Sequence, residues 1–371
     1  MRNSISLLFL GDVVPGGILS FNLDSRAVDD NVHRLLTSAD IVCANLESPL
    51  GIVKWARQSS SVNYSRPEDS IRLKELNLHI VSLANNHMFD LGERGFVETT
   101  RLLDDMGILY CGAGLTERQA RKPVYKEVHG LKFGFLAYSD NISGTLIAEN
   151  DSPGVAHINA AVMLEDVEYA ARECDYLYII LHWGSEYTWL PDPQSHPLAK
   201  ALLEHGASGI IGGHSHRPQA YWRYNKKPVF YSLGNFLYPD YVLAPPGIID
   251  YSNDAHHYDI FKLPVMKVRR KADRYYLRKW RCLSRVGQIA IITVKNKSQR
   301  VRVKYTQSDL IDSRLRILPT HLSLAINIWL KIIGLFVNSI CYPLLYSVLY
   351  RFIYLPILRP CKLFIRGLTR H

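Results

Sequence analysis

The stretch "ASGIIGGHSHRPQ", residues 207–219, places an apolar run directly before two glycines and two histidines at alternate positions. A short apolar run that ends in a glycine-bearing loop is typical of a buried strand in an α/β protein. Alternate residues of an extended strand point to opposite sides, whereas a turn can direct His214 and His216 toward one ion pair. Taken alone, the stretch leaves two alternatives open, because the histidines are either metal ligands or polar residues of a turn.

The same order of features recurs along the chain. Four earlier apolar runs also end in polar or glycine-bearing loops, and helical patterns occur between runs, as in residues 165–173 and 196–206. The four runs are "SISLLFL" (4–10), "DIVCANLE" (40–47), "LHIVSLA" (78–84) and "DYLYIILHWG" (175–184). Such runs predict buried, mostly parallel strands, and their alternation with helices predicts an α/β fold. Open α/β sheets bind their ligands at the carboxyl ends of parallel strands.

Each of these strand ends carries a side chain that can bind a metal. Imidazole, carboxylate and amide oxygen suit divalent ions of the Mn, Fe and Zn type, and a two-metal site needs a carboxylate that can bridge both ions. A lone Gly-Asp or a lone histidine beside a tryptophan is more often structural, but the full set in this order is a specific signal. The donors, in chain order, are Asp12, Glu47, Asn86, His182, His214 and His216.

This ordered set resembles the calcineurin-like metallophosphoesterase superfamily and, within it, the capsule-synthesis (CapA, or poly-γ-glutamate synthesis) family. The resemblance covers about residues 5–240. It implies an α/β/β/α sandwich that binds one or two divalent metal ions. The motifs that carry it are the first Gly-Asp, "NLESPL", "LANNHMFDLG", "HWGSEY", "GGHSHRPQ" and "YSLGNF".

The resemblance also implies a role for each donor. Asp12 and His216 would bind the first metal, and Glu47 stands where the superfamily uses a bridging aspartate. The second metal would be held by the remaining three donors, namely Asn86, His182 and His214.

His87 follows a ligand without being one, and the resemblance makes it the general acid for the leaving oxygen. An imidazole suits that role because it titrates near neutral pH. Two positions depart from the family's pattern. Val14 stands where the first motif supplies a histidine, and Glu47 has a longer side chain than the usual aspartate.

Four more residues are expected to contact substrate or to support the ligands. Glu186 and Tyr187 follow His182, where rim hydrogen bonding is the simpler interpretation. Arg217 is either a solvated cation or a contact to a phosphate or a polymer carboxylate. Asn235 is either part of a structural turn or faces the pocket.

Charge and hydropathy divide the chain into three parts. Residues 1–255 form the CapA-like metallophosphoesterase domain, residues 256–316 form a β-rich, basic extension of that domain, and residues 317–371 form an apolar, basic tail. Residues 267–371 carry 22 Lys and Arg against 3 Asp and Glu. The uncharged run 332–350 predicts that the tail associates with a membrane. A single span, an interfacial or re-entrant helix and a buried helix of a dimer all fit this run.

The apolar stretch near the N-terminus ends at Asp12 and is too short for a signal peptide. We therefore favour the cytoplasmic face of a bacterial membrane. The predicted function is that of a metal-dependent hydrolase in capsule or poly-γ-glutamate-type polymer synthesis, whose substrate is an anionic polymer or a phosphoester. The alternative is a non-hydrolytic member of a polymer synthesis complex. A nucleic-acid phosphodiesterase or binder ranks lower, because the uncharged run 332–350 does not suit a solvated nucleic-acid surface.

Overall fold

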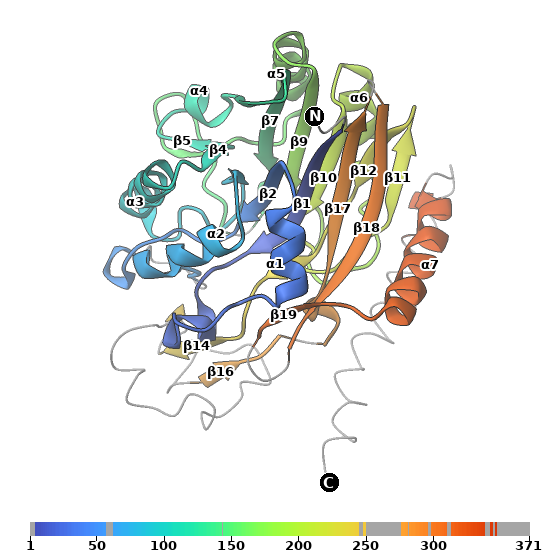
Figure 1. Cartoon of the computed structure of the whole chain (residues 1–371). Coiled ribbons are helices and arrows are strands. Elements are labelled where there is room, and N and C mark those ends of the chain that lie inside the picture. The colour runs from blue at the N-terminus through green and yellow to red at the C-terminus, as the bar shows by residue number, and fades with distance from the viewer. Residues whose placement is uncertain are drawn as a thin grey trace.

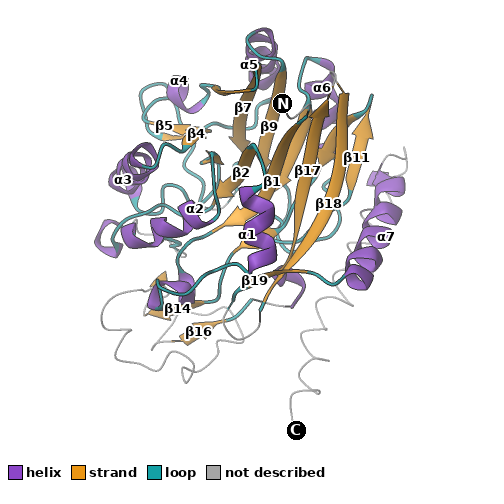
Figure 2. Cartoon of the chain, viewed as in Figure 1, coloured by secondary structure: helices purple, strands orange, loops and turns teal. Residues whose placement is uncertain are grey.

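The structure is a computed structural model that describes residues 4–56, 62–142, 144–244, 248–249, 276–280, 282–295, 298–309, 313–337, 342–343 and 346. Two β-sheets stack face to face, and helices cover the outer face of each sheet (Figures 1 and 2). The predicted α/β/β/α sandwich is therefore confirmed.

The first sheet has eight strands and is built around β1 (Ile5–Val13). Parallel strands lie on one side of β1 and antiparallel strands on the other, and a short parallel strand pairs with its carboxyl end. The parallel strands are β2 (Ile41–Leu46), β3 (Ile80–Ser82), β4 (Leu109–Cys111) and β13 (Asn235–Leu237). The antiparallel strands are β17 (Val286–Lys295), β18 (Ser298–Ser308) and β19 (Leu315–Ile317).

The second sheet has six strands, of which the inner four are parallel and the two edge strands are antiparallel. In spatial order they are β11 (Tyr221–Tyr224), β12 (Lys227–Phe230), β10 (Gly209–Gly213), β9 (Tyr176–His182), β7 (Leu131–Ser139) and β6 (Val124–Val128). His182 lies opposite Gly213 in the pairing of β9 with β10. The predicted runs at 175–184 and 207–213 are thus neighbouring strands.

The space between the sheets is filled by side chains from both of them. Phe9 of the first sheet packs against Tyr178 of the second, with ring centroids 4.9 Å apart. Leu7 and Phe9 point into this inner layer, whereas Leu8 and Leu10 point to the outer, helix-covered layer. Because β1 is buried on both faces, its sequence is continuously apolar rather than alternating.

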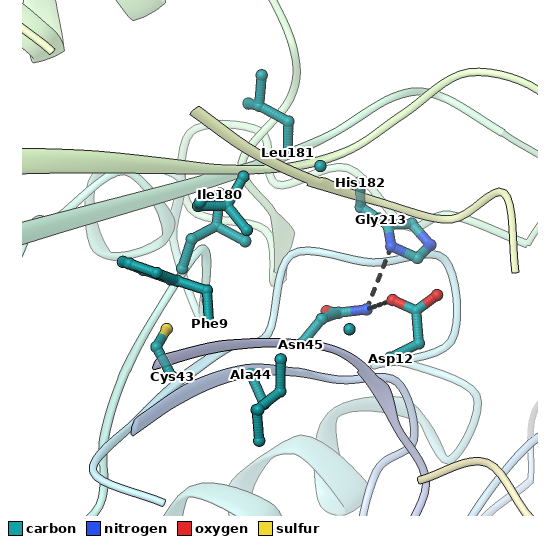
Figure 3. A pocket seen from close by; sticks show the side chains of 13 residues that line it. Phe9, Asp12, Cys43, Ala44, Asn45, Ile180, Leu181, His182 and Gly213 are labelled. Carbon is teal, nitrogen blue, oxygen red and sulfur yellow. Dashed lines mark hydrogen bonds between the residues drawn. The ribbon is translucent and has the colours of Figure 1, made fainter. Parts of the chain in front are cut away.

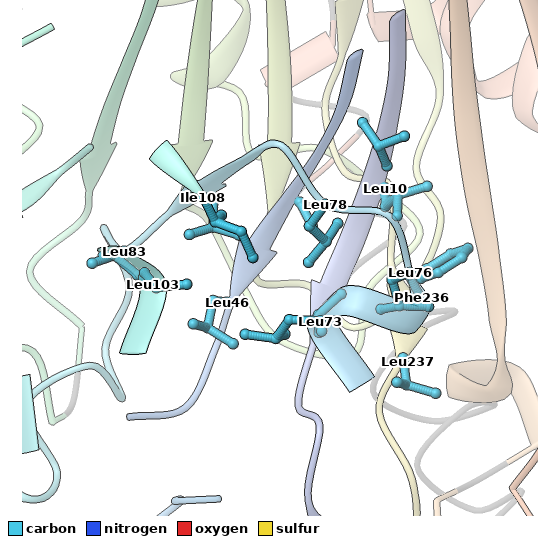
Figure 4. Close-up of a cluster of buried hydrophobic side chains, with 14 of the residues drawn as sticks. Leu10, Leu46, Leu73, Leu76, Leu78, Leu83, Leu103, Ile108, Phe236 and Leu237 are labelled. Atoms are coloured by element: carbon cyan, nitrogen blue, oxygen red, sulfur yellow. The ribbon is translucent and has the colours of Figure 1, made fainter. Parts of the chain in front are cut away.

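Helices close the two outer faces. α1 (Asp30–Thr37), α2 (Ile71–Glu75) and α3 (Gly92–Asp105) cover the first sheet, and Figure 4 shows the leucine-rich cluster beneath them. α5 (Ala160–Arg172), α6 (Ser195–Glu204) and α7 (Thr320–Val337) cover the second sheet. α5 and α6 contain most of the helical patterns predicted at 165–173 and 196–206, which extend one and two residues past the ends of these helices.

Smaller elements complete the described structure. They are α4 (Glu117–Ala120), the pair β5 (Ala113–Gly114) and β8 (Gly154–Val155), the sheet of β14 (Tyr241–Ala244), β15 (Ile248–Ile249) and β16 (Tyr276–Arg278), and 3-10 helices at Gly17–Phe21, Val53–Trp55, Pro67–Ser70 and Cys282–Arg285.

The segments predicted as a β-rich extension and an apolar tail are partly described. Residues 256–275 lie outside the described residues, but residues 290–294 of β17 pair with residues 5–9 of β1, so this part of the extension belongs to the main sheet. α7 is the helix among the described residues that is long and apolar enough to cross a membrane. It begins before the uncharged run 332–350 and overlaps only the start of it, and most of the tail lies outside the described residues.

Candidate metal centre

The predicted metal-binding side chains meet at one edge of the sandwich, where parallel strands of both sheets end. Asp12 lies in register with Asn45 of β2 and with Asn235 of β13. His182 ends β9 on the facing sheet. A Cβ atom on Gly213 would lie 2.9 Å from Oδ1 of Asp12, so the close approach of β10 to β1 requires a residue without a side chain.

A first cluster joins two carboxylates and one imidazole. Donor atoms of Asp12, Glu47 and His216 all lie within 4.8 Å of one another, and all three residues are buried. Oδ2 of Asp12 is 3.6 Å from Nδ1 of His216, and Oε1 of Glu47 is 3.7 Å from Nε2 of the same ring. These residues come from three strand ends that are far apart in the sequence.

A second cluster adjoins the first through Glu47. Nε2 of His182 is 2.9 Å from Oδ1 of Asn86, 3.1 Å from Nδ1 of His214 and 4.0 Å from Oε1 of Glu47. All these side chains are buried. The structure therefore brings together every side chain for which the sequence predicted metal binding, in the two groups that the resemblance implied.

The turn after β10 directs both of its histidines inward. His214 and His216 have positive φ angles of 81° and 52°, and their ring centroids are 6.2 Å apart. A non-glycine residue with positive φ costs on the order of 1–3 kcal/mol, and such strain concentrates at functional sites. The turn, rather than an extended strand, explains how alternate residues reach the same pocket.

The chemistry of these donors suits a divalent cation. Oδ2 of Asp12 and both carboxylate oxygens of Glu47 are buried and make no hydrogen bond among the described residues. Burial raises the pKa of Glu47, and the neighbouring charge of Asp12 raises it further. Buried carboxylates are normally paired or bound to a metal, because an isolated buried charge is costly. A cation between them would remove this cost.

The histidines of the second cluster are held in the form that binds metals. Burial lowers the pKa of His182, and His214 beside it lowers it further. Burial also lowers the pKa of His214, with His216 as the next cause. Neutral imidazole is the metal-binding form of histidine. His216 differs, because Asp12 and other acceptors outweigh the effect of burial and raise its pKa.

Two asparagines orient the cluster, and the sequence predicted only one of them. Nδ2 of Asn45 donates to Oδ1 of Asp12 at 2.8 Å and lies 3.2 Å from Nδ1 of His182, above a pocket between the sheets (Figure 3). Oδ1 of Asn235 lies 2.9 Å from Nδ1 of His216, and its Nδ2 donates to the carbonyl of Ser284. Asn235 thus faces the site. Asn45 lies two residues before Glu47 in the sequence, near the end of β2, and this position could have identified it as a residue of the site.

His87 forms a pair with an acidic residue. Its Nδ1 lies 2.7 Å from Oδ2 of Asp90, which also accepts a hydrogen bond from the backbone of Asn63. The His87 side chain is 15% exposed and that of Asp90 is 3% exposed, so the imidazole reaches solvent while its partner does not. α3 begins just after this pair, at Gly92, with Leu91 as its cap. The His-x-x-Asp spacing in the sequence could have indicated this pair.

The remaining predicted residues surround the first cluster. Tyr187 donates from its backbone to the carbonyl of Ser215, and its ring lies 5.6 Å from that of His216. Half-buried Glu186 helps to raise the pKa of His216, after Asp12. Arg217 is 4% exposed, so the solvated-cation interpretation is wrong.

Trp280, which the sequence did not indicate, packs 5.0 Å from the ring of His216. Its backbone donates to Asp240, whose carboxylate forms a buried ion pair with Arg285 at 2.6 Å. No motif marks this tryptophan, because it lies far from the histidine turn in the sequence. The position of Trp280 on the ring of His216 therefore depends on a buried charge pair.

Comparison with known proteins identifies the family. A family described as "Bacterial capsule synthesis protein PGA_cap" matches residues 6–240. The chain belongs to this family. The matched segment contains both clusters and the His87–Asp90 pair.

Individual relatives agree with this assignment. The chain is 29% identical over 248 residues to the capsule biosynthesis protein CapA of Bacillus anthracis, covering 64% of this chain and 60% of that protein. It is 28% identical over 240 residues to the PGA biosynthesis protein CapA of Bacillus subtilis (strain 168), covering 63% of each. The match thus spans about three fifths of the length of these relatives.

Solved structures show more distant similarity. A hypothetical protein from Thermus thermophilus aligns with a TM-score of 0.45 and 14% identity, covering 85% of this chain and all of that one. A 5'-nucleotidase precursor from the same organism aligns with a TM-score of 0.42 and 14% identity, covering 92% of this chain and 59% of that one. Similarity at this level does not define a shared activity.

Proposed function

We propose that this protein is a metal-dependent hydrolase of phosphoester-type bonds that acts in the synthesis of a capsule or a poly-γ-glutamate-type polymer. The observation that carries the proposal is the convergence, at one edge of the sandwich, of buried carboxylate oxygens without hydrogen-bond partners, two histidines of lowered pKa and a partly exposed His87.

One or two divalent ions would bind at the two clusters. Asp12 and His216 hold the first, and Glu47 lies between the clusters, where a carboxylate can bridge two ions. The second is held by Asn86, His182 and His214. A bound divalent ion supplies Lewis acidity, which polarises a phosphoryl oxygen and acidifies water.

His87 acts as the general acid. Asp90 fixes the ring through Nδ1, which leaves Nε2 to carry a proton to the leaving oxygen. As that proton departs or returns, the buried carboxylate of Asp90 stabilises the positively charged imidazolium. Glu186, Tyr187 and Arg217 border the histidine turn and are proposed to contact the substrate, an anionic polymer or a phosphoester.

The proposed biological setting comes from the family and from its named relatives in capsule and PGA biosynthesis. The apolar helix α7 supports a location at a membrane surface, where a polymer synthesis complex would work. A nucleic-acid substrate is not proposed, because the apolar surface of α7 does not suit a polyanion.

A non-hydrolytic role in a polymer synthesis complex is the second candidate, and one observation favours it. Val14 is buried and donates its backbone to Leu237, so no imidazole stands where the superfamily's first motif places one. The first cluster therefore has one donor fewer, and the protein could bind an ion and an anionic ligand without turnover.

Metal content and turnover separate the two candidates. We expect purified full-length protein to contain Mn, Fe or Zn by elemental analysis and, with Mn²⁺, to hydrolyse members of a panel of phosphomonoesters and phosphodiesters. Asp12→Ala should remove both metal and activity, and His87→Ala should remove activity alone. Asp105→Ala and His129→Ala, on exposed side chains, are the matched controls. Bound metal without turnover of any ester would favour the non-hydrolytic role, and protein without metal would contradict both.

A further inference from the structure

We propose that α7 binds the surface of an anionic phospholipid bilayer while lying parallel to it, with its opposite face fixed on the second sheet. The inference deepens the membrane association proposed above and is independent of whether the metal centre turns over a substrate. It decides between the alternatives that the sequence left open for the tail, namely a span, an interfacial helix and a dimer contact.

One face of α7 belongs to the folded body. Leu330, Ile333 and Val337 are at most 6% exposed and belong to the core cluster that also contains side chains of α6 and β12. Gly334 faces β11, where a Cβ atom would lie 3.5 Å from the carbonyl oxygen of Tyr221. Figure 1 shows α7 beside the β11 edge of the second sheet.

The opposite face of α7 is apolar and uncovered. Leu324, Ile328 and Leu335 are 57%, 50% and 76% exposed, and their successive spacings of four and seven residues place them on one side of the helix. Trp329 is also more than half exposed. Tryptophan is enriched where a membrane meets water. Soluble proteins rarely expose so continuous an apolar surface without a partner.

The chain after α7 returns to the same body. The hydroxyl of Tyr342 donates to the carbonyl of Pro191 at 2.7 Å, and that of Tyr346 donates to Asp192 at 2.6 Å. A helix whose C-terminal half packs on the sheet, and that is followed by the anchored Tyr342, cannot stand upright in a bilayer unless it leaves the sheet.

Charge selects an anionic lipid surface as the partner. Residues 313–371 contain eight Lys and Arg and no Asp or Glu. Lys331 is exposed on α7 itself, where its long side chain can reach the head groups while the helix stays among the acyl chains. A second copy of this chain would present the same unbalanced positive charge, so a symmetric contact through α7 would be repulsive.

The tie between the tail and the body also places the metal centre relative to the lipid. Pro191 and Asp192 belong to the loop that follows His182 and includes Tyr187, the neighbour of His216. A bilayer on α7 therefore adjoins the loop that borders the site. This arrangement suits a substrate that is itself attached to the membrane.

Vesicle binding tests the inference directly. Full-length protein is centrifuged with phosphatidylcholine vesicles prepared with and without phosphatidylglycerol. We expect strong binding to the anionic vesicles and weak binding to the neutral ones. The variant L324E/I328E/L335E should reduce binding to anionic vesicles by at least about 100-fold, because three apolar contacts are lost.

The matched control is I71E/V97E/Y169E, which makes the same change in charge on exposed apolar residues of α2, α3 and α5. It should bind as wild type does. If both variants lose binding equally, net charge rather than α7 determines it, and the inference fails. It also fails if the α7 variant binds like wild type.

The depth of α7 in the bilayer and the oligomeric state of the protein distinguish the proposed surface helix from a membrane span and from a dimer contact. Lipids brominated near the head group should quench the fluorescence of Trp329, measured as the difference from Trp329→Phe, more than lipids brominated near the bilayer centre. Stronger quenching from the centre would indicate a span and overturn the inference. Light scattering measures the oligomeric state. If the wild-type protein is a dimer that does not bind vesicles, and the α7 variant is a monomer, the exposed face of α7 contacts a second copy instead of lipid. If the protein binds vesicles but hydrolyses no ester, only the proposed hydrolase activity is contradicted, and the membrane inference stands.

Discussion

Replacing Asp90 with asparagine tests the proposed general acid without removing any metal ligand. The carboxylate of Asp90 lies 2.7 Å from Nδ1 of His87 and is almost completely buried. A hydrogen bond to a charged group contributes about 1.5–3 kcal/mol. If this hydrogen bond stabilises the imidazolium of His87 during proton transfer, losing it lowers the rate of hydrolysis roughly ten- to hundredfold.

The assay compares esters whose leaving groups differ in acidity. A phenolate that carries a nitro group leaves without a proton, whereas an alkoxide needs one from His87. Asp90→Asn should therefore slow alkyl esters by about ten- to hundredfold and nitrophenyl esters little, with unchanged metal content. Asp105→Asn, on an exposed side chain of α3, is the control. Equal losses on both classes of ester, or loss of metal, would refute the assignment of His87 as an acid.

Three further changes test the surroundings of the site. Because burial and the charge of Asp12 raise the pKa of Glu47, the metal-free folded state holds a proton there more tightly than the unfolded chain does. Glu47→Gln should then stabilise the metal-free protein by about 1–3 kcal/mol at neutral pH and progressively less as the pH falls toward about 4.5. Thermal melts in chelator across this pH range measure the difference, and a variant that melts no higher than wild type at neutral pH would contradict it. Gly213→Ala places a Cβ atom 2.9 Å from Asp12 and should weaken Mn²⁺ binding by about tenfold in calorimetric titrations, so unchanged affinity would argue against a tight contact here. Arg285→Ala leaves Asp240 buried without its cation and should lower the unfolding free energy by about 3–5 kcal/mol in urea titrations, whereas a loss below about 1 kcal/mol would mean that water replaces the arginine.

The sequence predicted the layers of the fold because the strands carry a strong local signal. β1, β2, β9 and β10 are mostly apolar, since both of their faces are buried, and each ends in a polar or glycine-bearing turn. Those turns contain the donor residues, and the family resemblance that they carry implied how the donors divide between the two clusters. Because these strand ends lie together in the confirmed fold, the donor side chains meet at one edge of the sandwich. Their roles as metal ligands are proposed.

What the sequence did not predict depends on contacts between distant segments. Asn45 is one polar residue inside a strand, and only the approach of His182 from the second sheet gives it a function. Trp280 reaches His216 because the Asp240–Arg285 pair holds it there. Arg217 was ambiguous because burial, which excludes a solvated cation, is a property of the packed molecule. The pairing of His87 with Asp90 was predictable in principle, since the two residues are only three positions apart in the sequence.

The two clusters differ in charge, and this difference bears on the missing histidine at Val14. Asp12 and Glu47 together bring two carboxylates to the first cluster, and both keep buried oxygens without hydrogen-bond partners. The second cluster adds neutral donors, with one amide oxygen and two imidazoles of lowered pKa. A hard cation is attracted mainly by carboxylate charge, so the first cluster can lose one neutral donor and still attract an ion. The departure at Val14 would therefore change the geometry and exchange of a first ion more than its presence, and the longer side chain of Glu47 places its carboxylate between the two clusters.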